Sequence, residues 1–341
     1  MIQASSEAYL LGDAAAVGAA RRAVRSLVAR LGLPETDAAP AELALTELAT
    51  NVERHAGGDG YALLRTVAEE RGIEILVVDR GPGTSAPAPA LGAASPSGGL
   101  GIGLDSVRRL ASSFELYAPP GKGRVTLARF SFDDSPTPLP IAYAGVSVPV
   151  LPLDVNGDGW AVTIDEGGCT VLVVDGLGHG PGAHRAAQAA LRTFEEGFGR
   201  DICSWFPRAH EVMRGTRGGV AGIARIDIGR RVVTFAGVGN VTGSVVLDGS
   251  SRALLSRPGV LGTEHRLPSP YLMETPWTAD SALVLWTDGL KSRITLDGHP
   301  GLLDHDPALV AALLHRDFAK GNDDATVVVV RETSGRPEHT E

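Results

Sequence analysis

Apolar positions follow two different spacings along the first part of this chain. Where they recur every three to four residues they indicate one buried face of a helix, and where they run on for four to eight residues they indicate a buried strand. Gly32 and Gly57 follow two of the helical stretches, as is common at helix ends. The pattern predicts helices over 13–32, 40–56 and 103–114, and strands over 61–70, 72–79 and 124–132. These elements predict a layered α/β domain with its helices on one side of a sheet.

The later part of the chain is patterned as strands in hairpin order with few helices between them. Strands are predicted over 160–176, 219–239, 243–249, 282–289 and 323–332, with two helices over 182–197 and 305–319. Strands joined as hairpins imply antiparallel pairing, and the scarcity of helices excludes a doubly wound sheet. The pattern therefore predicts a sandwich of two antiparallel sheets with helices outside.

A proline-rich stretch without periodicity separates the two parts. Proline clusters of this kind are typical of semi-rigid linkers. We expect domains over residues 1–133 and 153–333, a linker over 134–152 and a flexible tail over 334–341.

Composition and charge exclude several classes of partner. The 341 residues carry a net charge of −9 and no basic tract, which argues against nucleic-acid binding. The longest apolar runs have the length of strands, so we expect no membrane span. The two cysteines form no CxxC motif and fit thiols in a reducing compartment. We therefore expect a cytoplasmic protein.

A first candidate site begins on the second predicted helix, where Glu47, Asn51 and His55 recur at i, i+4 and i+8 and so share one face. Such a triple alone is typical of a solvated face. Asp79, however, ends a strand before a Gly-Pro-Gly turn, where its carboxylate can accept a hydrogen bond from a ligand amine. A glycine-rich loop then opens into the third predicted helix, whose first amides can bind phosphate. The glycine spacing matches neither a P-loop nor a Rossmann fingerprint.

Four motifs in this order, TELATNVERHA, DRGPG, GGLGIGL and PGKGRV, resemble the GHKL (Bergerat) ATP-binding family, and within it the RsbT-like anti-sigma switch kinases. The resemblance spans nearly all of residues 1–130. It implies a GHKL α/β sandwich in which Asn51 holds Mg²⁺ against the ATP phosphates, Glu47 acts as general base and Asp79 reads the adenine amine. It also implies a set of residues around the nucleotide: Gly81, Gly83, Gly98, Gly99, Leu100, Gly101, Ile102 and Gly103.

One position departs from that family's pattern. The last glycine box of the family ends in Gly-x-Gly-Thr, with the threonine near the adenine, whereas Arg124 stands here. The departure favours a weak ATP site and keeps open a non-catalytic role for this part of the chain.

A second candidate site is a group of carboxylates. Four aspartates lie in turns at the ends of predicted core strands: Asp158, Asp175, Asp288 and Asp323. A single Asp-Gly pair is an ordinary hairpin turn, but four such aspartates at core strand ends are harder to explain in that way. No histidine or cysteine at metal spacing accompanies them, and carboxylates alone select hard cations such as Mg²⁺ or Mn²⁺.

The motifs GDGW, VVDGLGHG, FAGVGN, TDGL and NDDATVVVV, in this order over about residues 150–331, resemble the SpoIIE-type serine/threonine phosphatases of the PPM superfamily. RGTRGG, GVGNVTG and RPGVLG resemble its RsbX-like branch. The resemblance implies an αββα sandwich of two antiparallel sheets that binds two Mn²⁺ or Mg²⁺ ions.

The same resemblance assigns roles to the aspartates. Asp175 would bridge the two metals, with Asp158 on one metal and both Asp288 and Asp323 on the other. The backbone carbonyl of Gly176 would complete a metal shell. His179 is a candidate general acid, although the family's acid stands two residues after the bridging aspartate, where Leu177 is found here. This spacing favours a structural role for His179.

The two resemblances together predict a bifunctional regulator of partner switching that controls an alternative sigma factor. One half would phosphorylate a serine or threonine on a STAS-domain anti-anti-sigma or stressosome protein, and the other would remove the phosphate. Three alternatives remain open for the first half: an ATP-dependent clamp without phosphotransfer, a module that sequesters a sigma factor directly, and an inactive ATP fold.

Overall fold

The computed structural model describes residues 6–67, 71–83, 101–132, 139–150, 155–197, 201–247, 249–263 and 267–333. The chain divides into two compact units. The N-terminal unit comprises Ser6–Thr137 together with Asp304–Leu313, and the C-terminal unit comprises Pro138–Leu303 and Leu314–Glu341. Within the described ranges, none of the helices is both long enough and apolar enough to cross a membrane.

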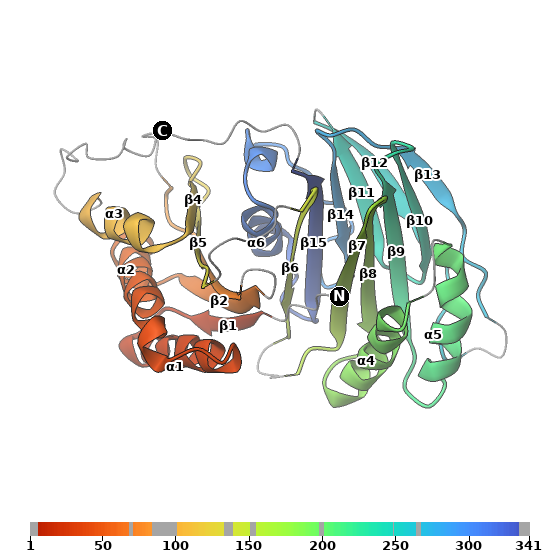
Figure 1. The fold of residues 1–341 in the computed structure, drawn as a ribbon, viewed down its shortest axis with the longest axis horizontal. Coiled ribbons are helices and arrows are strands. Elements are labelled where there is room, and N and C mark those ends of the chain that lie inside the picture. The colour runs from red at the N-terminus through yellow and green to blue at the C-terminus, as the bar shows by residue number, and fades with distance from the viewer. Residues whose placement is uncertain are drawn as a thin grey trace. The chain divides into compact units, whose positions relative to one another are not determined.

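In the described residues of Ser6–Thr137, one antiparallel sheet packs with helices α1, α2 and α3 (Figure 1). The strands are β1 (Glu7–Leu10), β2 (Gly60–Val67), β3 (Gly72–Asp79), β4 (Ser113–Tyr117) and β5 (Arg124–Phe130). The helices are α1 (Ala14–Arg30), α2 (Ala39–Ala56) and α3 (Gly101–Leu110). The strands are ordered β1-β2-β3-β5-β4, and every neighbouring pair is antiparallel.

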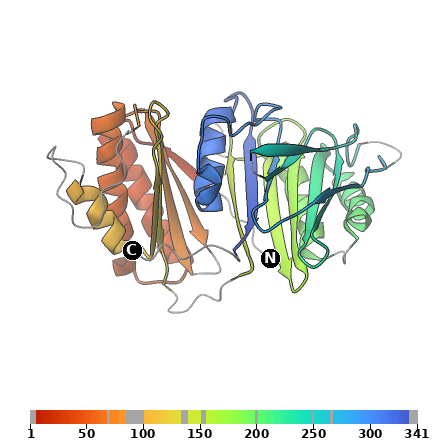
Figure 2. The ribbon, with the colours of Figure 1, turned by 90° about the horizontal axis from the view of Figure 1, so that it is seen from above.

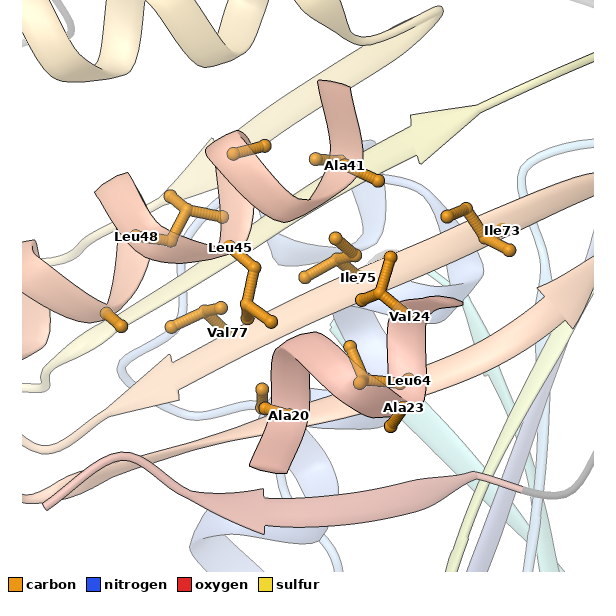
Figure 3. Packing of buried hydrophobic residues seen from close by; sticks show 14 of the residues in the cluster. Ala20, Ala23, Val24, Ala41, Leu45, Leu48, Leu64, Ile73, Ile75 and Val77 are labelled. Carbon is orange, nitrogen blue, oxygen red and sulfur yellow. The ribbon is translucent and has the colours of Figure 1, made fainter. Parts of the chain in front are cut away.

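The core of this unit lies between the sheet and helices α1 and α2. Figure 3 shows Val24 of α1 and Leu45 of α2 packed against Ile75 and Val77 of β3, and all four are buried. The helix ends follow the sequence. Asp13 caps α1 by accepting a 2.8 Å hydrogen bond from the Ala16 amide, and Gly57 ends α2 with φ of 60°. The predicted arrangement of helices on one side of a sheet is confirmed.

The third predicted helix, 103–114, is too long at its C-terminal end. The helix ends at Leu110, and Ser113 already begins β4. The Ser112 amide donates to the Arg129 carbonyl at 2.8 Å, so pairing with β5 replaces the helical pattern at this point. Strand β1 was not predicted, because its four residues are too few to show a period.

A buried ionic cluster lies on the sheet of the N-terminal unit. The Glu74 side chain is fully buried and accepts hydrogen bonds from Arg65 at 2.6 Å and from Arg129 at 2.8 Å. Arg129 also donates two hydrogen bonds, of 2.6 and 2.7 Å, to Asp306 of the segment Asp304–Leu313. This segment is distant in sequence but groups with the N-terminal unit.

Two antiparallel five-stranded sheets form the C-terminal unit. One is ordered β13-β10-β9-β8-β7, from β7 (Asp158–Asp165), β8 (Gly168–Gly176), β9 (Gly219–Asp227), β10 (Val232–Val238) and β13 (Met273–Pro276). The other is ordered β12-β11-β14-β15-β6, from β6 (Ile141–Val148), β11 (Thr242–Leu247), β12 (Ser250–Leu255), β14 (Ala282–Trp286) and β15 (Ala325–Glu332). The helices are α4 (Pro181–Glu195), α5 (Trp205–Met213) and α6 (Pro307–Phe318), the last of which the division into units splits after Leu313.

Apolar side chains from both sheets meet in one core, which includes Val171 and Phe235 of the first sheet and Leu285 and Val328 of the second. A second core lies between the first sheet and helices α4 and α5, which cover its outer face (Figure 2). The sequence prediction of two antiparallel sheets with helices outside is confirmed as a mixed α/β fold with three antiparallel sheets in all.

Residues 141–148 correct the sequence analysis, which assigned them to an irregular linker. They form strand β6 and pair with β15 along their whole length, from Ile141 opposite Glu332 to Val148 opposite Ala325. Pro140 and Pro149 lie directly before and after this strand, so they flank it without interrupting its ladder.

Candidate functional site

Asp158 and Asp175 face each other at one end of the first sheet of the C-terminal unit. Asp158 begins β7, Asp175 lies one residue before the end of β8, and the two are direct partners in the antiparallel register. Directly opposed residues place their side chains on the same face, with Cβ atoms about 5 Å apart. Asp158 is only 5% exposed. The hairpin register therefore brings together two carboxyl groups, of which Asp158 is buried and Asp175 half-buried.

The electrostatics of these groups show that the other two aspartates lie nearby. Burial raises the pKa of Asp175 to about 9, with further contributions from the charges of Asp158, Asp288 and Asp323. Burial likewise raises the pKa of Asp158 to about 7, although hydrogen bonds from neighbouring hydroxyls lower it. The pKa of Asp288 is also raised, first by burial and then by Asp323. The charges of the other three predicted aspartates all act on Asp175 and disfavour its ionisation, so the four lie close to one another.

Two threonines that the sequence analysis missed hold Asp158 in place. The Thr287 hydroxyl, 1% exposed, donates to Asp158 Oδ2 at 2.7 Å and accepts from the Thr326 amide at 3.0 Å. The Thr326 hydroxyl also hydrogen-bonds Asp158 and lowers its pKa. Their position in the sequence could have identified them, because Thr287 directly precedes Asp288 and Thr326 closely follows Asp323.

Asp324, next to a predicted ligand, has a different role. Its two carboxylate oxygens accept from the Val150 amide at 2.8 Å and the Gly157 amide at 2.6 Å. It therefore ties the segment before β7 to the start of β15. Both of these partners lie far from Asp324 along the chain. Asp323 accepts from the Asp324 amide at 2.9 Å, and Asp288 accepts from the Asn240 side chain at 2.7 Å.

The loop after Asp175 depends on a glycine at position 176. A Cβ on Gly176 would lie 2.2 Å from the Ala183 carbonyl oxygen, closer than any real contact, so no other residue fits without movement. The loop continues with Leu177, whose amide donates to the Gly218 carbonyl at 3.0 Å. His179 follows and is exposed. Another histidine, His184, bonds the Asn156 carbonyl through Nδ1 at 2.8 Å and anchors α4 to the loop before β7.

The chemistry of this group fits hard divalent cations. Buried carboxylates that raise one another's pKa are stabilised when a cation takes the place of their protons. In the described part of the chain, no group of three or more His, Cys, Asp or Glu side chains is already arranged to hold a metal ion. The fit of these aspartates to divalent cations therefore rests on the chemical type of the side chains, on their burial and on their mutual repulsion.

In the N-terminal unit, Glu47 and Asn51 lie on α2 as predicted. Asn51 is 8% exposed, and its side-chain Nδ2 has no hydrogen-bond partner among the described residues. A Cβ on Gly103 would lie 2.6 Å from Glu47 Oε2, so α3 approaches α2 closely at the predicted general base. A buried amide donor without a partner is costly and indicates a place where a ligand oxygen can bind.

Asp79 ends β3 beside this helix and is 6% exposed. Its Oδ1 accepts from the Gly81 amide at 2.9 Å. Gly83 has φ of +66°, and a Cβ there would lie 2.2 Å from the Pro119 carbonyl oxygen, so the turn requires glycine. Gly98, Gly99 and Leu100, which were predicted to cover the nucleotide, lie outside the described residues; Gly101 and Ile102 open helix α3.

Arg124 occupies the position where the family pattern has threonine. It begins β5 and is the direct partner of Asp79 in the register between β3 and β5. It is 8% exposed, and its Nε has no hydrogen-bond partner among the described residues. The pKa of His55 on α2 is lowered, first by burial and then by the charge of Arg124. Arg124, Asp79 and His55 therefore lie near one another at the C-terminal end of α2.

These observations define a class: a chain that joins an α/β unit of helices on one side of an antiparallel sheet to a unit of two antiparallel sheets with four neighbouring aspartates. The family model for the histidine kinase-like ATPase domain matches residues 11–129. Over 108 residues the chain is 36% identical to the serine/threonine-protein kinase RsbT of Bacillus subtilis, covering 31% of this chain and 80% of the relative. Through its N-terminal unit the chain belongs to the RsbT family of histidine kinase-like ATPase domains.

The C-terminal unit has relatives of its own. Over 138 residues, 40% of this chain and 68% of the relative, the chain is 28% identical to the phosphoserine phosphatase RsbX of Bacillus subtilis. The chain also matches a solved structure with 25% identity and a TM-score of 0.51. That structure belongs to work on the bacterial stressosome as a modular system that has been adapted to control secondary messenger signaling. That match covers 56% of this chain and 99% of the solved chain. The two resemblances seen in the sequence, one for each part of the chain, are thus confirmed.

Proposed function

We propose that this protein is a bifunctional regulator of partner switching, with a metal-dependent serine/threonine phosphatase in residues 153–333 and an ATP-dependent serine/threonine kinase in residues 1–133. Both halves act on a STAS-domain anti-anti-sigma or stressosome protein. The similarity to a kinase and to a phosphoserine phosphatase within one chain supports this pairing. A cytoplasmic setting is part of the proposal, because both cysteines are free thiols and ATP is the phosphoryl donor.

The observation that carries the phosphatase is the opposition of Asp158 and Asp175 beside Asp288 and Asp323. Asp175 would bridge two Mn²⁺ or Mg²⁺ ions, Asp158 would hold one, and Asp288 with Asp323 would hold the other, helped by the carbonyl of Gly176. When bound, such a metal pair supplies Lewis-acid chemistry that lowers the pKa of water and neutralises phosphoryl charge.

The protein's own contribution is to orient and confine these ligands. Thr287 fixes the rotation of the Asp158 carboxyl group through its 2.7 Å hydrogen bond. Asp324 fixes the segment that directly precedes Asp158, the first residue of β7, through its hydrogen bonds to the Val150 and Gly157 amides. Supports of this kind set the affinity of a metal site as strongly as the ligands themselves.

For the kinase half, Asn51 would hold Mg²⁺ against the ATP phosphates, and its unpartnered Nδ2 is available to a phosphate oxygen. Glu47 would accept the proton of the acceptor hydroxyl, and Asp79 would read the base. Phosphoryl transfer requires positioning and charge neutralisation more than covalent chemistry, so this small set of residues is sufficient.

The test uses purified full-length chain, γ-labelled ATP, Mg²⁺ with Mn²⁺, and a STAS-domain protein encoded near this gene. Asp175→Asn should abolish phosphate removal and let labelled STAS protein accumulate, and added wild type should then remove the label. Asn51→Ala should abolish labelling while leaving dephosphorylation of a prepared phosphoprotein intact. A wild-type protein that releases no phosphate from any phosphorylated STAS protein would refute the phosphatase assignment.

A second function for the N-terminal unit is favoured by Arg124, which stands in the place of the family's threonine. In that case the unit is a nucleotide-dependent clamp that binds a STAS protein or a sigma factor without phosphotransfer. Partner binding that requires nucleotide and is lost in Asn51→Ala, with no label transferred by Asp175→Asn, would support the clamp. Co-purification with a sigma factor and no STAS protein would identify the sigma factor as the partner.

A further inference from the structure

Arg124 lies on the same face of the sheet as Asp79. Side chains alternate along a strand, and Ala128 and Phe130 of β5 belong to the core beneath α1 and α2. Arg124, an even number of residues before them, therefore points to the helix side. On β3, Ile75 and Val77 point to that side (Figure 3), and so does Asp79. Because Arg124 and Asp79 are also direct partners in the register, their side chains are neighbours.

The guanidinium group of Arg124 is buried with unused donor capacity. The residue is 8% exposed, and its Nε has no hydrogen-bond partner among the described residues. Leaving a charged N–H group buried and unpaired is costly, so such groups in native structures indicate a missing partner. The influence of Arg124 on His55 places it at the C-terminal end of α2, where the predicted base-reading residue Asp79 also lies. A hydrogen-bond acceptor on a bound nucleotide would supply the missing partner.

The two neighbours offer a carboxylate acceptor and a guanidinium donor side by side. The edge of guanine presents two N–H donors, N1 and the 2-amine, next to a carbonyl acceptor, O6. The edge of adenine presents one amine and a weaker ring-nitrogen acceptor. A carboxylate can accept both guanine donors, and an arginine paired with guanine O6 is among the most discriminating contacts to a base.

Resting on the nucleotide site proposed above, we propose that Arg124 reads the O6 carbonyl of guanine, so that the N-terminal unit prefers guanine nucleotides to adenine nucleotides. Asp79 then accepts from N1–H and the 2-amine. The family pattern has a threonine at this position, which carries no charge and cannot make the charged arginine contact to O6. If the kinase half is active, it accepts GTP in addition to ATP as phosphoryl donor, with a lower KM for GTP.

The experiment measures the affinities of GTP, ITP and ATP for the full chain in Mg²⁺, by displacement of a fluorescent nucleotide. ITP retains O6 and N1–H but lacks the 2-amine, so the comparison of ITP with GTP measures the 2-amine contact, and the effect of Arg124→Thr on ITP binding measures the contact with O6. In the wild type we expect GTP and ITP to bind about tenfold or more tightly than ATP. Arg124→Thr should shift the GTP-to-ATP and ITP-to-ATP affinity ratios at least tenfold towards ATP. Arg124→Lys, which keeps the positive charge but loses the planar guanidinium group, should give intermediate ratios.

Arg80→Thr is the matched control. It removes an exposed arginine next to Asp79 in sequence, with 59% of the side chain accessible, and should leave the ratios unchanged. An equal shift in Arg80→Thr and Arg124→Thr would show a general charge effect and overturn the proposal. If Arg124→Thr does not fold, as judged by circular dichroism, the ITP to ATP ratio of the wild type decides.

Two outcomes separate this proposal from the function on which it rests. Tight ATP binding with ATP preferred over ITP, and unchanged ratios in Arg124→Thr, would overturn base reading by Arg124 and leave the nucleotide site intact. Failure of the wild type to bind any of the three nucleotides would overturn both the nucleotide site and the base preference, and would leave the phosphatase assignment untouched.

Discussion

Replacing Thr287 by valine tests the metal site without touching a predicted ligand. The side chain keeps its shape but loses the hydroxyl that donates to Asp158 Oδ2 at 2.7 Å and accepts from the buried Thr326 amide at 3.0 Å. A hydrogen bond to a charged group contributes about 1.5–3 kcal/mol, and a buried donor left without an acceptor costs about 1–3 kcal/mol.

Two consequences follow from these magnitudes. The free energy of unfolding should fall by about 2–4 kcal/mol, because the Thr326 amide and the Asp158 carboxyl both lose a partner inside the sheet. The Mn²⁺ concentration that gives half-maximal phosphatase activity should rise about 10–100-fold, since loss of an orienting partner typically lowers metal affinity by that factor. The rate at saturating Mn²⁺ should stay close to that of the wild type, because every ligand is still present.

The assays are urea unfolding and a Mn²⁺ titration of activity on a phosphoprotein. Thr193→Val is the matched control. The Thr193 side chain is equally buried, but its hydroxyl bonds the Ala190 carbonyl of its own helix at 2.7 Å. It should lose little stability and leave the Mn²⁺ titration unchanged. An unaltered Mn²⁺ requirement in Thr287→Val would show that the hydrogen bond to Asp158 does not support a metal site.

Three further changes have expected outcomes. Because the pKa values of Asp158 and Asp175 lie near 7 and 9 in the metal-free protein, against an ordinary 3.8, the native state binds more protons than the unfolded state. Stability in EDTA should therefore fall as pH rises from about 4 to 9, and Asp175→Asn should flatten the dependence of Tm on pH. Glu74→Ala should cost about 3–5 kcal/mol in urea unfolding, because it removes the buried carboxylate that two arginines bond. Gly176→Ala should abolish phosphatase activity because of the Ala183 carbonyl 2.2 Å from the new methyl group, whereas Gly215→Ala, with nothing within 4 Å, should not.

Each of these three predictions has a result that would contradict it. A Tm in EDTA that does not fall between pH 5 and 8.5 would argue against close, buried carboxyl groups at Asp158 and Asp175. A loss below about 1 kcal/mol in Glu74→Ala, comparable with the loss from a surface ion pair, would argue against the buried cluster. Full activity in Gly176→Ala would show that the loop after Asp175 tolerates a side chain and does not shape the site.

Local signals predicted much of this protein well. The N-cap at Asp13 and the left-handed glycine at position 57 follow from side-chain chemistry within one helical turn, and the structure has both. The four aspartates stand out because carboxylates at core strand ends are unusual. Their mutual effects on pKa place them together.

Non-local pairing explains what the sequence analysis missed. Strand β6 was hidden among prolines, and only its partner β15 makes it part of a sheet. The third helix ended early because β5 offered Ser112 a backbone partner. Thr287, directly after β14, and Thr326, in β15, were overlooked because the sequence does not show which group a threonine hydroxyl will bond.

By itself, the sequence determined the positions of most helices and strands, the presence of two differently patterned parts, and the carboxylates and glycines that indicate metal and nucleotide chemistry. Only the tertiary structure decided which of these groups meet. The register of β7 with β8 opposes Asp158 and Asp175, and the register of β3 with β5 sets Arg124 beside Asp79. The physical reason is that hydrophobic periodicity is a property of neighbouring residues, whereas register depends on which strands pair, and a shift of one residue would turn every one of these side chains to the other face.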